Sequence, residues 1–211
     1  IGIVTASTRP HRIGHRVATW VRGLAPDEVE VVDIDLRELA LPLLDEPEMP
    51  STGVYAHEHT RRWAALVNGV DAVVFVMPEY NRGYNAALKN AIDYLYVEWK
   101  GKPVACVGYG WSGAQYARSA LRQTLDRVGM VVVEGSALLF DKTLDTDGTV
   151  HADETSLLHT ATLQPAVDFG RLEQVFVMAH RGPTMDLLYG GDGDLPAETA
   201  AAPPAAPEGR P

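Results

Sequence analysis

The residues best suited to bind a ligand lie in one short segment, residues 73–93, where an apolar run ends in a polar and aromatic stretch. Residues 73–77 predict a strand that is buried on both faces. Residues 78–84, PEYNRGY, then add a carboxylate, two phenols, an amide and a guanidinium group. In an open α/β sheet, ligands bind at the carboxyl ends of the strands. This mixture favours a flat heterocycle with polar edges over a metal ion or a lone phosphate.

Hydroxyl and guanidinium groups gather in residues 6–14, the turn between the first apolar run and the first helical pattern. Ser7 and Thr8 supply hydroxyls, and Arg9 and Arg12 supply positive charge. Backbone N–H groups at a helix N-terminus attract phosphate, and arginine adds charge-assisted hydrogen bonds. The turn therefore predicts a phosphate site. The simpler alternative is a helix cap with two solvated arginines.

A third loop, residues 108–113 with the sequence GYGWSG, matches the glycine pattern of dinucleotide-binding proteins. Glu134 follows at a distance suited to a ribose contact, so a NAD-binding Rossmann domain is one hypothesis. That glycine pattern normally occupies the first strand–helix turn, where this chain has its better phosphate site. The Rossmann hypothesis also leaves the PEYN stretch unexplained, and it stays an alternative.

Five short apolar runs alternate with five helical patterns, and this alternation predicts a parallel sheet with right-handed crossovers. Strands are predicted over residues 1–5, 29–34, 72–77, 104–107 and 130–133, and helices over residues 14–24, 57–68, 86–96, 114–128 and 154–178. With five strands, the doubly wound order 2-1-3-4-5 is expected, which gives a flavodoxin-like three-layer α/β sandwich. This order brings the three loops together at the carboxyl edge of the sheet. Residues 38–52 contain three prolines and are expected to form a long surface connection.

The composition is that of one globular domain followed by a tail. The chain has 211 residues, of which 46% are hydrophobic and 22% are charged. We place the domain at residues 1–181, and the Pro-, Ala- and Gly-rich residues 182–211 predict a flexible tail. The formal net charge of -10 argues against nucleic acid as the main partner. No apolar run reaches the length of a membrane span.

The cysteine and histidine residues argue against an internal disulfide and a metal site. Cys106 is the only cysteine, which excludes a disulfide within the chain and suits a reducing cytoplasm. We expect it to be a small core residue. Among the seven histidines, His57 and His59 lack the spacing of a zinc helix, and we expect no metal site.

Two motifs carry a family resemblance. Residues 78–81 read PEYN and residues 89–93 read KNAID, and this pairing resembles the NAD(P)H-dependent FMN reductase family, whose fold is flavodoxin-like. The stretch DLREL…LPLLDEP in residues 35–47 is similar to that family as well. The resemblance implies an FMN site built from three loops. Its residues would be Ser7, Thr8, Arg9, Arg12, Ile13 and Gly14 around the phosphate, Pro78, Glu79, Tyr80, Asn81 and Gly83 along the ring, Arg82 and Tyr84 nearer the rim, and Gly110, Trp111, Ser112 and Gly113 at the ring edge.

Four positions depart from the family pattern. Ala6 replaces a glycine, and Arg12 stands where serine is frequent, so the phosphate contacts are expected to differ in detail. Trp111 stands where small residues are frequent, either near the ring or as a packing residue. Asn85 replaces a proline before the helix, and we expect its side chain to cap that helix.

The same resemblance implies an FMN-dependent NAD(P)H oxidoreductase with a ping-pong mechanism. NADPH or NADH would give hydride to FMN and leave before an acceptor takes the electrons, and no protein side chain need act as acid or base. Quinones, free flavin, azo compounds and a partner monooxygenase are all compatible acceptors. A homodimer or homotetramer is expected, with the aromatic residues 94–99 as a candidate interface. The alternative from another class is a flavodoxin-type one-electron carrier.

Overall fold

The computed structural model describes residues 1–133 and 136–151. The predicted helix over residues 154–178, the predicted tail over residues 182–211 and Glu134 lie outside the described residues. The boundary between domain and tail therefore stays a prediction. In the described ranges, no helix combines the length and the apolar character needed to cross a membrane.

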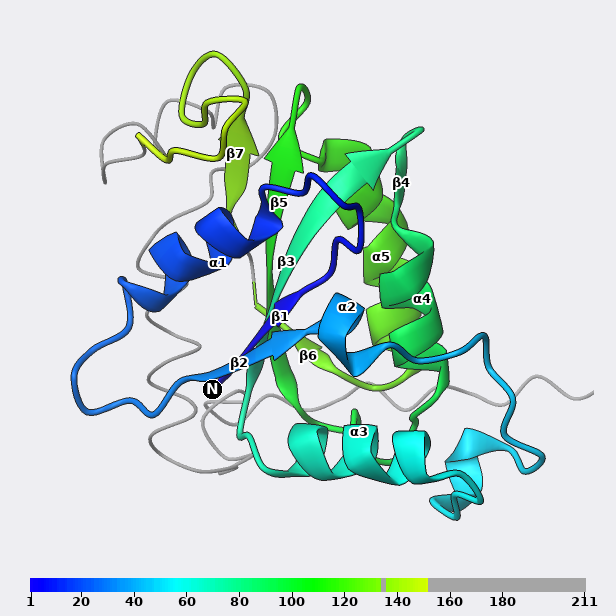
Figure 1. Cartoon of the computed structure of the whole chain (residues 1–211). Helices are drawn as coiled ribbons and strands as arrows, with labels where there is room; N and C mark the ends of the chain where they lie inside the picture. Colours follow the sequence, from blue (N-terminus) through cyan, green and yellow to red (C-terminus); the bar gives the residue numbers. More distant parts are fainter. Residues whose placement is uncertain (134–135, 152–211) are drawn as a thin grey trace, which may run out of the picture.

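The sheet has the predicted strand order (Figure 1). Its parallel strands run in the order β2-β1-β3-β5-β6, which is 2-1-3-4-5 when the main strands are counted along the chain. This order is the flavodoxin-like one, so the predicted fold class is confirmed. The strands are β1 (Gly2–Thr5), β2 (Val32–Asp35), β3 (Val73–Tyr80), β4 (Gly83–Tyr84), β5 (Pro103–Gly110), β6 (Val131–Val132) and β7 (Ala137–Leu139).

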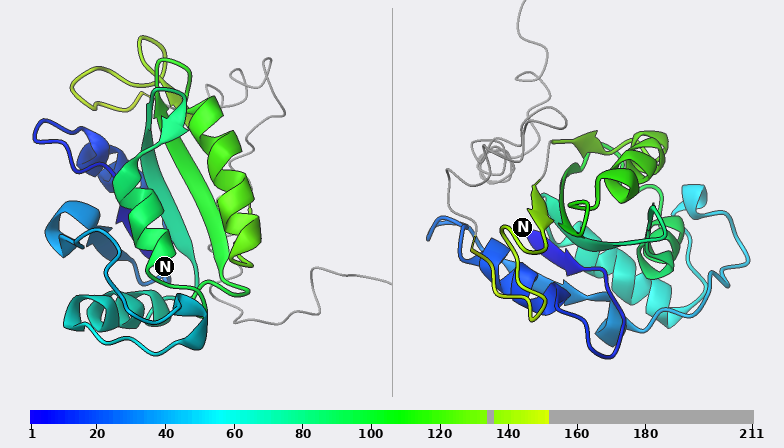
Figure 2. Two further views of the ribbon diagram at one scale, coloured as in Figure 1. Left: turned by 90° about the vertical axis from the view of Figure 1, so that its right-hand side faces the viewer. Right: turned by 90° about the horizontal axis from the view of Figure 1, so that it is seen from above.

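Helices cover both faces of the sheet, as Figure 2 shows. The helices are α1 (Gly14–Arg22), α2 (Leu36–Leu39), α3 (Glu58–Asn68), α4 (Ala86–Asp93) and α5 (Gln115–Arg127), with a 3-10 turn η1 (Pro50–Thr52). The apolar face of α1 joins one core cluster, and those of α2, α3, α4 and α5 join the other. Alternate residues of β3 serve the two clusters, because Phe75 faces the larger one and Val74 and Val76 face the smaller one.

Residues 78–84 are not the open loop that the sequence predicted. β3 continues through them and turns back into β4, and Glu79 pairs with Tyr84 in antiparallel register. Asn81 (φ 52°) and Arg82 (φ 62°) form the turn, and both have the positive φ that a type I′ hairpin requires. The stretch is therefore a hydrogen-bonded hairpin that extends the central strand beyond the sheet.

β5 is also longer than predicted and takes in the first half of the glycine loop. It pairs in parallel with β3 from Val104, opposite Val73, to Tyr109, opposite Pro78. On its other edge, β6 pairs with the beginning of β5 and β7 pairs with its end. The predicted fifth strand, residues 130–133, therefore corresponds to β6, and β7 is a further short strand that follows it along β5.

Asn85 precedes α4 but does not cap it with its side chain, so the expected cap is wrong. The side-chain amide donates to the carbonyl of Ala6 at 2.7 Å instead. The backbone carbonyl of Asn85 accepts from Leu88 and Lys89, which is sufficient to begin the helix. Asn85 therefore ties the start of α4 to the loop that follows β1.

The surface connection expected over residues 38–52 spans residues 40–57, between α2 and α3, and α4 and the residue after it hold its first part. Asn90 donates to the carbonyl of Pro42 at 2.6 Å. Tyr94 donates to the carboxylate of Asp45 at 2.9 Å. The connection is therefore fixed to the body of the protein by side-chain hydrogen bonds rather than by regular secondary structure.

The aromatic stretch 94–99 lies in the core rather than on an exposed surface. Tyr94 and Trp99 are buried, and the Trp99 indole N–H donates to the carbonyl of Ile92 at 3.0 Å. Val97 is the large apolar side chain of this stretch that faces solvent, at 46% exposure. Exposure therefore does not support residues 94–99 as the interface, because most of their apolar surface is already covered.

Cys106 is expected to be unreactive in the folded protein. It lies buried in β5, as predicted, and burial raises the pKa of its thiol to about 12. Little thiolate then forms near neutral pH, and thiolate is the reactive species. A disulfide-exchange reagent should leave the native protein unlabelled and should label one thiol per chain in denaturant. Rapid labelling of the native protein would contradict the described packing of β5.

Candidate functional site

One cavity at the carboxyl edge of the sheet brings the three predicted loops together. Its volume is about 310 Å³. The residues that line it are Ser7, Arg9, His11, Arg12, Ile13, Pro78, Glu79, Tyr80, Tyr109, Gly110, Trp111, Ser112, Phe140 and Thr146. The strand order explains the convergence, because β1, β3 and β5 are neighbours and their carboxyl ends meet.

Some predicted site residues lie away from this cavity. They are Thr8, Gly14, Asn81, Arg82, Gly83, Tyr84 and Gly113. Asn81 and Arg82 form the hairpin turn, beyond the part of β3 that lines the cavity. Tyr84 turns toward α5, where its hydroxyl lies 2.8 Å from that of Thr124. This contact does not support the expected position of Tyr84 near the rim, because its side chain packs on a helix.

Four lining residues were not among the predicted site residues: His11, Tyr109, Phe140 and Thr146. His11 and Tyr109 lie inside two of the predicted loops, so their positions in the sequence offered a signal. Phe140 and Thr146 follow β7, and no motif marks them. The pairing of β7 with β5 brings Phe140 to the cavity, and the ion pair of Arg16 with Asp147 holds the loop that contains Thr146 against α1.

Ser7 and Tyr80 connect the first loop to the hairpin, since their hydroxyl oxygens are 2.9 Å apart. Tyr109 is buried near them, and burial together with Tyr80 raises the pKa of Tyr109 above its ordinary value. Its phenol therefore stays protonated near neutral pH. The same phenol explains Gly14, because a Cβ at that position would lie 2.8 Å from the Tyr109 hydroxyl oxygen.

Arg12 is the buried cation of the site. Its side chain is 10% exposed, and its Nη2 donates to Asp35 at the end of β2. Asp35 is oriented in turn, because its other oxygen accepts from the backbone N–H of Arg37. The Nε and Nη1 atoms of Arg12 are buried and have no hydrogen-bond partner among the described residues. A buried donor without a partner costs about 1–3 kcal/mol, so the site fits an anion that would accept from Arg12.

Aromatic side chains line the mouth of the cavity. Trp111 is 70% exposed and meets Phe140 edge to face, with their ring centroids 5.1 Å apart. The guanidinium of Arg9 lies 5.9 Å from the centroid of the Tyr80 ring. Flat, apolar faces beside cationic groups suit a planar aromatic ligand that carries negative charge.

The carboxylate of Glu79 occupies the N-terminus of α5. It accepts from the Ser112 hydroxyl at 2.6 Å and from the N–H groups of Tyr116 and Ala117 at 2.9 and 3.1 Å. The Rossmann hypothesis needs such N–H groups for a pyrophosphate. That hypothesis is not supported, because a carboxylate already fills this position and Gly108 lies within β5 rather than in a turn.

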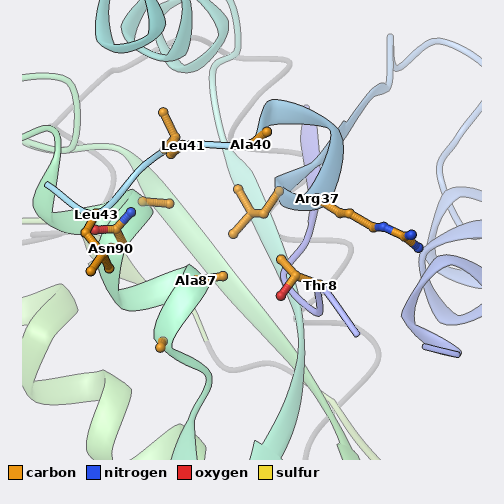
Figure 3. Close-up of a pocket in the computed structure, with 10 residues that line it drawn as sticks. Thr8, Arg37, Ala40, Leu41, Leu43, Ala87 and Asn90 are labelled. Atoms are coloured by element: carbon orange, nitrogen blue, oxygen red, sulfur yellow. The ribbon is translucent and has the colours of Figure 1, made fainter. Parts of the chain in front are cut away.

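A second cavity, of about 330 Å³, lies between α2, the residues that follow it and α4, and Figure 3 shows its lining. Thr8 lines this cavity, whereas Ser7 lines the first one. Leu41, Leu43 and Ala87 give the second cavity a mainly apolar wall. The two hydroxyls of the predicted phosphate loop therefore face different cavities, and Ser7 is the better candidate for a phosphate contact.

Comparison with known proteins agrees with this geometry. The sequence profile of the NADPH-dependent FMN reductase family matches residues 1–145. An NAD(P)H-dependent FMN reductase of Saccharomyces cerevisiae is 38% identical over 151 residues, which cover 65% of this chain and 79% of the yeast protein. A quinone reductase of Pseudomonas putida is 33% identical over 156 residues, which cover 67% of this chain and 81% of that protein.

A solved structure with a similar fold is FerB, a flavoenzyme NAD(P)H:(acceptor) oxidoreductase from Paracoccus denitrificans, with a TM-score of 0.62. It is 24% identical in sequence and covers 86% of this chain and 97% of its own, so the likeness concerns the fold alone. The family profile and the yeast relative of 38% identity decide the assignment. The chain belongs to the family of NADPH-dependent FMN reductases, oxidoreductases that use FMN with NAD(P)H as the electron donor.

Proposed function

We propose that this protein oxidises NAD(P)H through FMN held in the cavity between the three loops and passes the electrons to a quinone or a similar small acceptor. The cofactor and the donor follow from family membership. The place of FMN, the ping-pong order and the acceptor are inferred. A reducing cytoplasm is the proposed location, because Cys106 is the only cysteine and is buried.

The two unpartnered donors of Arg12 are the observation that carries this proposal. Nε and Nη1 point to different edges of the guanidinium, and a phosphate oxygen would accept a charge-assisted hydrogen bond from either donor. The N-terminus of α1 lies next to Arg12, and its N-cap residue, Ile13, makes no side-chain cap. The N–H of Arg16 donates to the carbonyl of Ile13 at 2.9 Å, whereas the N–H groups of Gly14 and His15 would be available to an anion. Together with the Ser7 hydroxyl, these groups would hold the phosphate of FMN.

The hairpin and the glycine loop would hold the ring. Tyr80 and Trp111 present aromatic faces, and the pairing of β3 with β4 and β5 fixes the backbone on which they stand. Bound FMN would supply the redox chemistry by taking hydride from NAD(P)H and returning electrons to an acceptor. The protein's part is to orient the reactants, exclude water and stabilise charge.

The ionisable side chains around the cavity do not act as acids or bases in this proposal. The carboxylate of Glu79 is engaged with three donors, from Ser112, Tyr116 and Ala117. The raised pKa of Tyr109 keeps its phenol protonated. We therefore assign binding and orientation to these residues and no proton transfer.

The shape of the mouth supports consecutive binding of donor and acceptor. Trp111 and Phe140 form one aromatic edge beside the cavity, on which a nicotinamide and a quinone would stack in turn. The relative named quinone reductase in Pseudomonas putida supports quinones as the first acceptor class to test. Azo compounds, free flavin and a partner monooxygenase are the other acceptors that an exposed aromatic mouth would admit.

A homodimer or homotetramer is the proposed assembly, with residues 40–57 at the contact. Exposed large apolar side chains are concentrated there, namely Leu43, Leu44, Met49 and Val54. Val97 lies against the same segment, since a Cβ at Gly53 would be 3.2 Å from a Val97 methyl group. Such a concentration of exposed apolar groups marks an interaction surface.

Purified protein is expected to bind added FMN and to lose its visible flavin absorbance when NADPH or NADH is added without oxygen. The faster nucleotide names the preferred donor, and a quinone added afterwards should restore the absorbance. Steady-state rates should give parallel double-reciprocal plots, as a ping-pong order requires. Intersecting plots would contradict that order. Bound flavin that neither nucleotide reduces would favour the one-electron carrier.

Replacing Arg12 is expected to weaken FMN binding selectively. Arg12→Lys keeps the charge but removes the unpartnered guanidinium donors, so FMN affinity should fall by about 10- to 100-fold in fluorescence titrations. Riboflavin lacks the phosphate and should bind the variant and the wild type alike. Arg22→Lys is the matched control, because Arg22 makes an exposed ion pair with Asp33. Equal losses for both flavins would show that Arg12 does not contact the phosphate.

The assembly is expected to weaken when residues 40–57 gain charge. Leu43→Asp and Met49→Asp should each shift the sedimentation coefficient toward that of a monomer, because a buried carboxylate without a partner opposes association. Trp111→Asp changes an equally exposed apolar residue outside this segment and should leave the sedimentation coefficient unchanged. A wild-type protein that sediments as a monomer at micromolar concentration would refute the proposed assembly.

A further inference from the structure

Glu79 caps a helix that begins far along the chain. α5 has no cap of its own, because its N-cap residue, Ala114, has φ 55° and makes no side-chain hydrogen bond, and its first turn contains no acidic residue. Helices are usually capped by a local Ser, Thr, Asp or Asn. Here the N–H groups of Tyr116 and Ala117 donate to Glu79, 37 and 38 positions earlier in the sequence.

The same carboxylate joins two walls of the cavity. Its Oε1 accepts from Ser112 at 2.6 Å, and both Glu79 and Ser112 line the cavity. Among the described residues, this is the side-chain hydrogen bond that joins the glycine loop to the hairpin. Beyond Pro78 and Tyr109, the last paired residues of β3 and β5, the two walls are therefore joined by one carboxylate.

Two further contacts fasten the hairpin to α5. The guanidinium of Arg82 lies 4.8 Å from the centroid of the Tyr116 ring, although Arg82 must adopt a positive φ of 62° at the turn. The hydroxyls of Tyr84 and Thr124 are 2.8 Å apart. The hairpin and the helix thus form one body, in which Glu79 makes the contact nearest to the cavity.

Glu79 also distinguishes the two helices that begin at the cavity. The N-terminus of α1 lies beside the unpartnered donors of Arg12 and is not capped by its N-cap side chain. The N-terminus of α5 is filled by the Glu79 carboxylate. An anion approaching α5 would meet a like charge, whereas an anion approaching α1 would meet a cation.

We propose that Glu79 is a positioning residue that acts in two ways. It fixes Ser112 and the glycine loop at a set distance from the hairpin, and it keeps the N-terminus of α5 closed to the anionic end of the cofactor. The ring is thereby placed between the hairpin and the glycine loop, with its phosphate at the first loop. This inference rests on the proposed function, because it takes FMN to be the occupant of the cavity.

Glu79→Gln tests the proposal, because the amide keeps the shape, loses the negative charge and has one acceptor oxygen, which cannot accept from both Ser112 and the N–H groups of α5. In protein without flavin, amide hydrogen exchange at Tyr116 and Ala117 should accelerate by about tenfold or more. Affinity should fall by about tenfold for both FMN and riboflavin, because the ring is affected rather than the phosphate. The equal loss separates this variant from Arg12→Lys.

A second variant separates positioning from helix stability. Glu79→Gln combined with Gln115→Glu returns a negative charge to the first turn of α5, which should recover part of the melting temperature. The tie to the hairpin stays broken, so flavin affinity should remain low. Recovery of flavin affinity together with melting temperature would overturn the positioning role, since capping alone would then explain the loss.

Glu46 supplies the matched control, since its carboxylate accepts from the N–H groups of Ala56 and His57 at 2.8 and 3.1 Å just before α3. Glu46→Gln should lower the melting temperature and leave flavin affinity unchanged. If Glu79→Gln leaves both amide hydrogen exchange and flavin affinity unchanged, the inference about Glu79 is overturned and the proposed function still stands. Wild-type protein that binds neither flavin would overturn the proposed function, and exchange measured without flavin would still decide whether Glu79 caps α5.

Discussion

The parallel pairing of β3 with β5 is the contact on which the site depends. It runs from Val73 opposite Val104 to Pro78 opposite Tyr109, and both strands extend beyond the end of β1 at Thr5. The extended ends of β3 and β5 form two walls of the cavity beyond the carboxyl edge of the sheet. The first loop, which follows β1, lies between the sheet edge and these walls. Because side chains alternate along a strand, the pairing decides which groups of each wall meet the cavity and which meet the helices. The neighbouring pieces, the hairpin and β7, are short and gain their order from these two strands.

Arg12 shows how the site can be ready for an anion in a chain whose net charge is -10. One carboxylate, that of Asp35, is enough to keep the guanidinium buried and oriented but leaves two of its nitrogen atoms unpartnered. A buried ion pair with unsatisfied donors adds little to stability by itself, because desolvation offsets the attraction. A ligand that completes the hydrogen bonding therefore adds its binding energy to the folded state. We therefore attribute most of the affinity for an anionic ligand to the first loop, and the orientation of that ligand to the two walls.

The strand order and the meeting of the three loops could be predicted from the sequence, because alternation of buried strands and amphipathic helices leaves few topologies. The hairpin could not be predicted from the sequence, because Arg82 occupies the turn position where the usual Asn-Gly signal has glycine. The cap expected of Asn85 failed for a different reason, namely that the carbonyl of Ala6, remote in sequence, competes for the amide. Phe140 and Thr146 reach the cavity through the pairing of β7 and the contact of Asp147 with Arg16. The features that local sequence patterns did not predict are thus contacts between residues far apart in the chain.

The glycine pattern of residues 108–113 illustrates how one sequence pattern can serve two physical ends. A Cβ at Gly108 would lie 2.7 Å from that of Ala114, and a Cβ at Gly113 would lie 2.9 Å from that of Ala137. The same close approach of strand and helix is what a dinucleotide-binding turn requires of its glycines. Here the helix that follows takes its negative charge from Glu79, within the protein, instead of from a pyrophosphate. The glycines therefore indicate tight packing between a strand and a helix. Whether the N-terminus of that helix can bind a phosphate depends on the group that already occupies it.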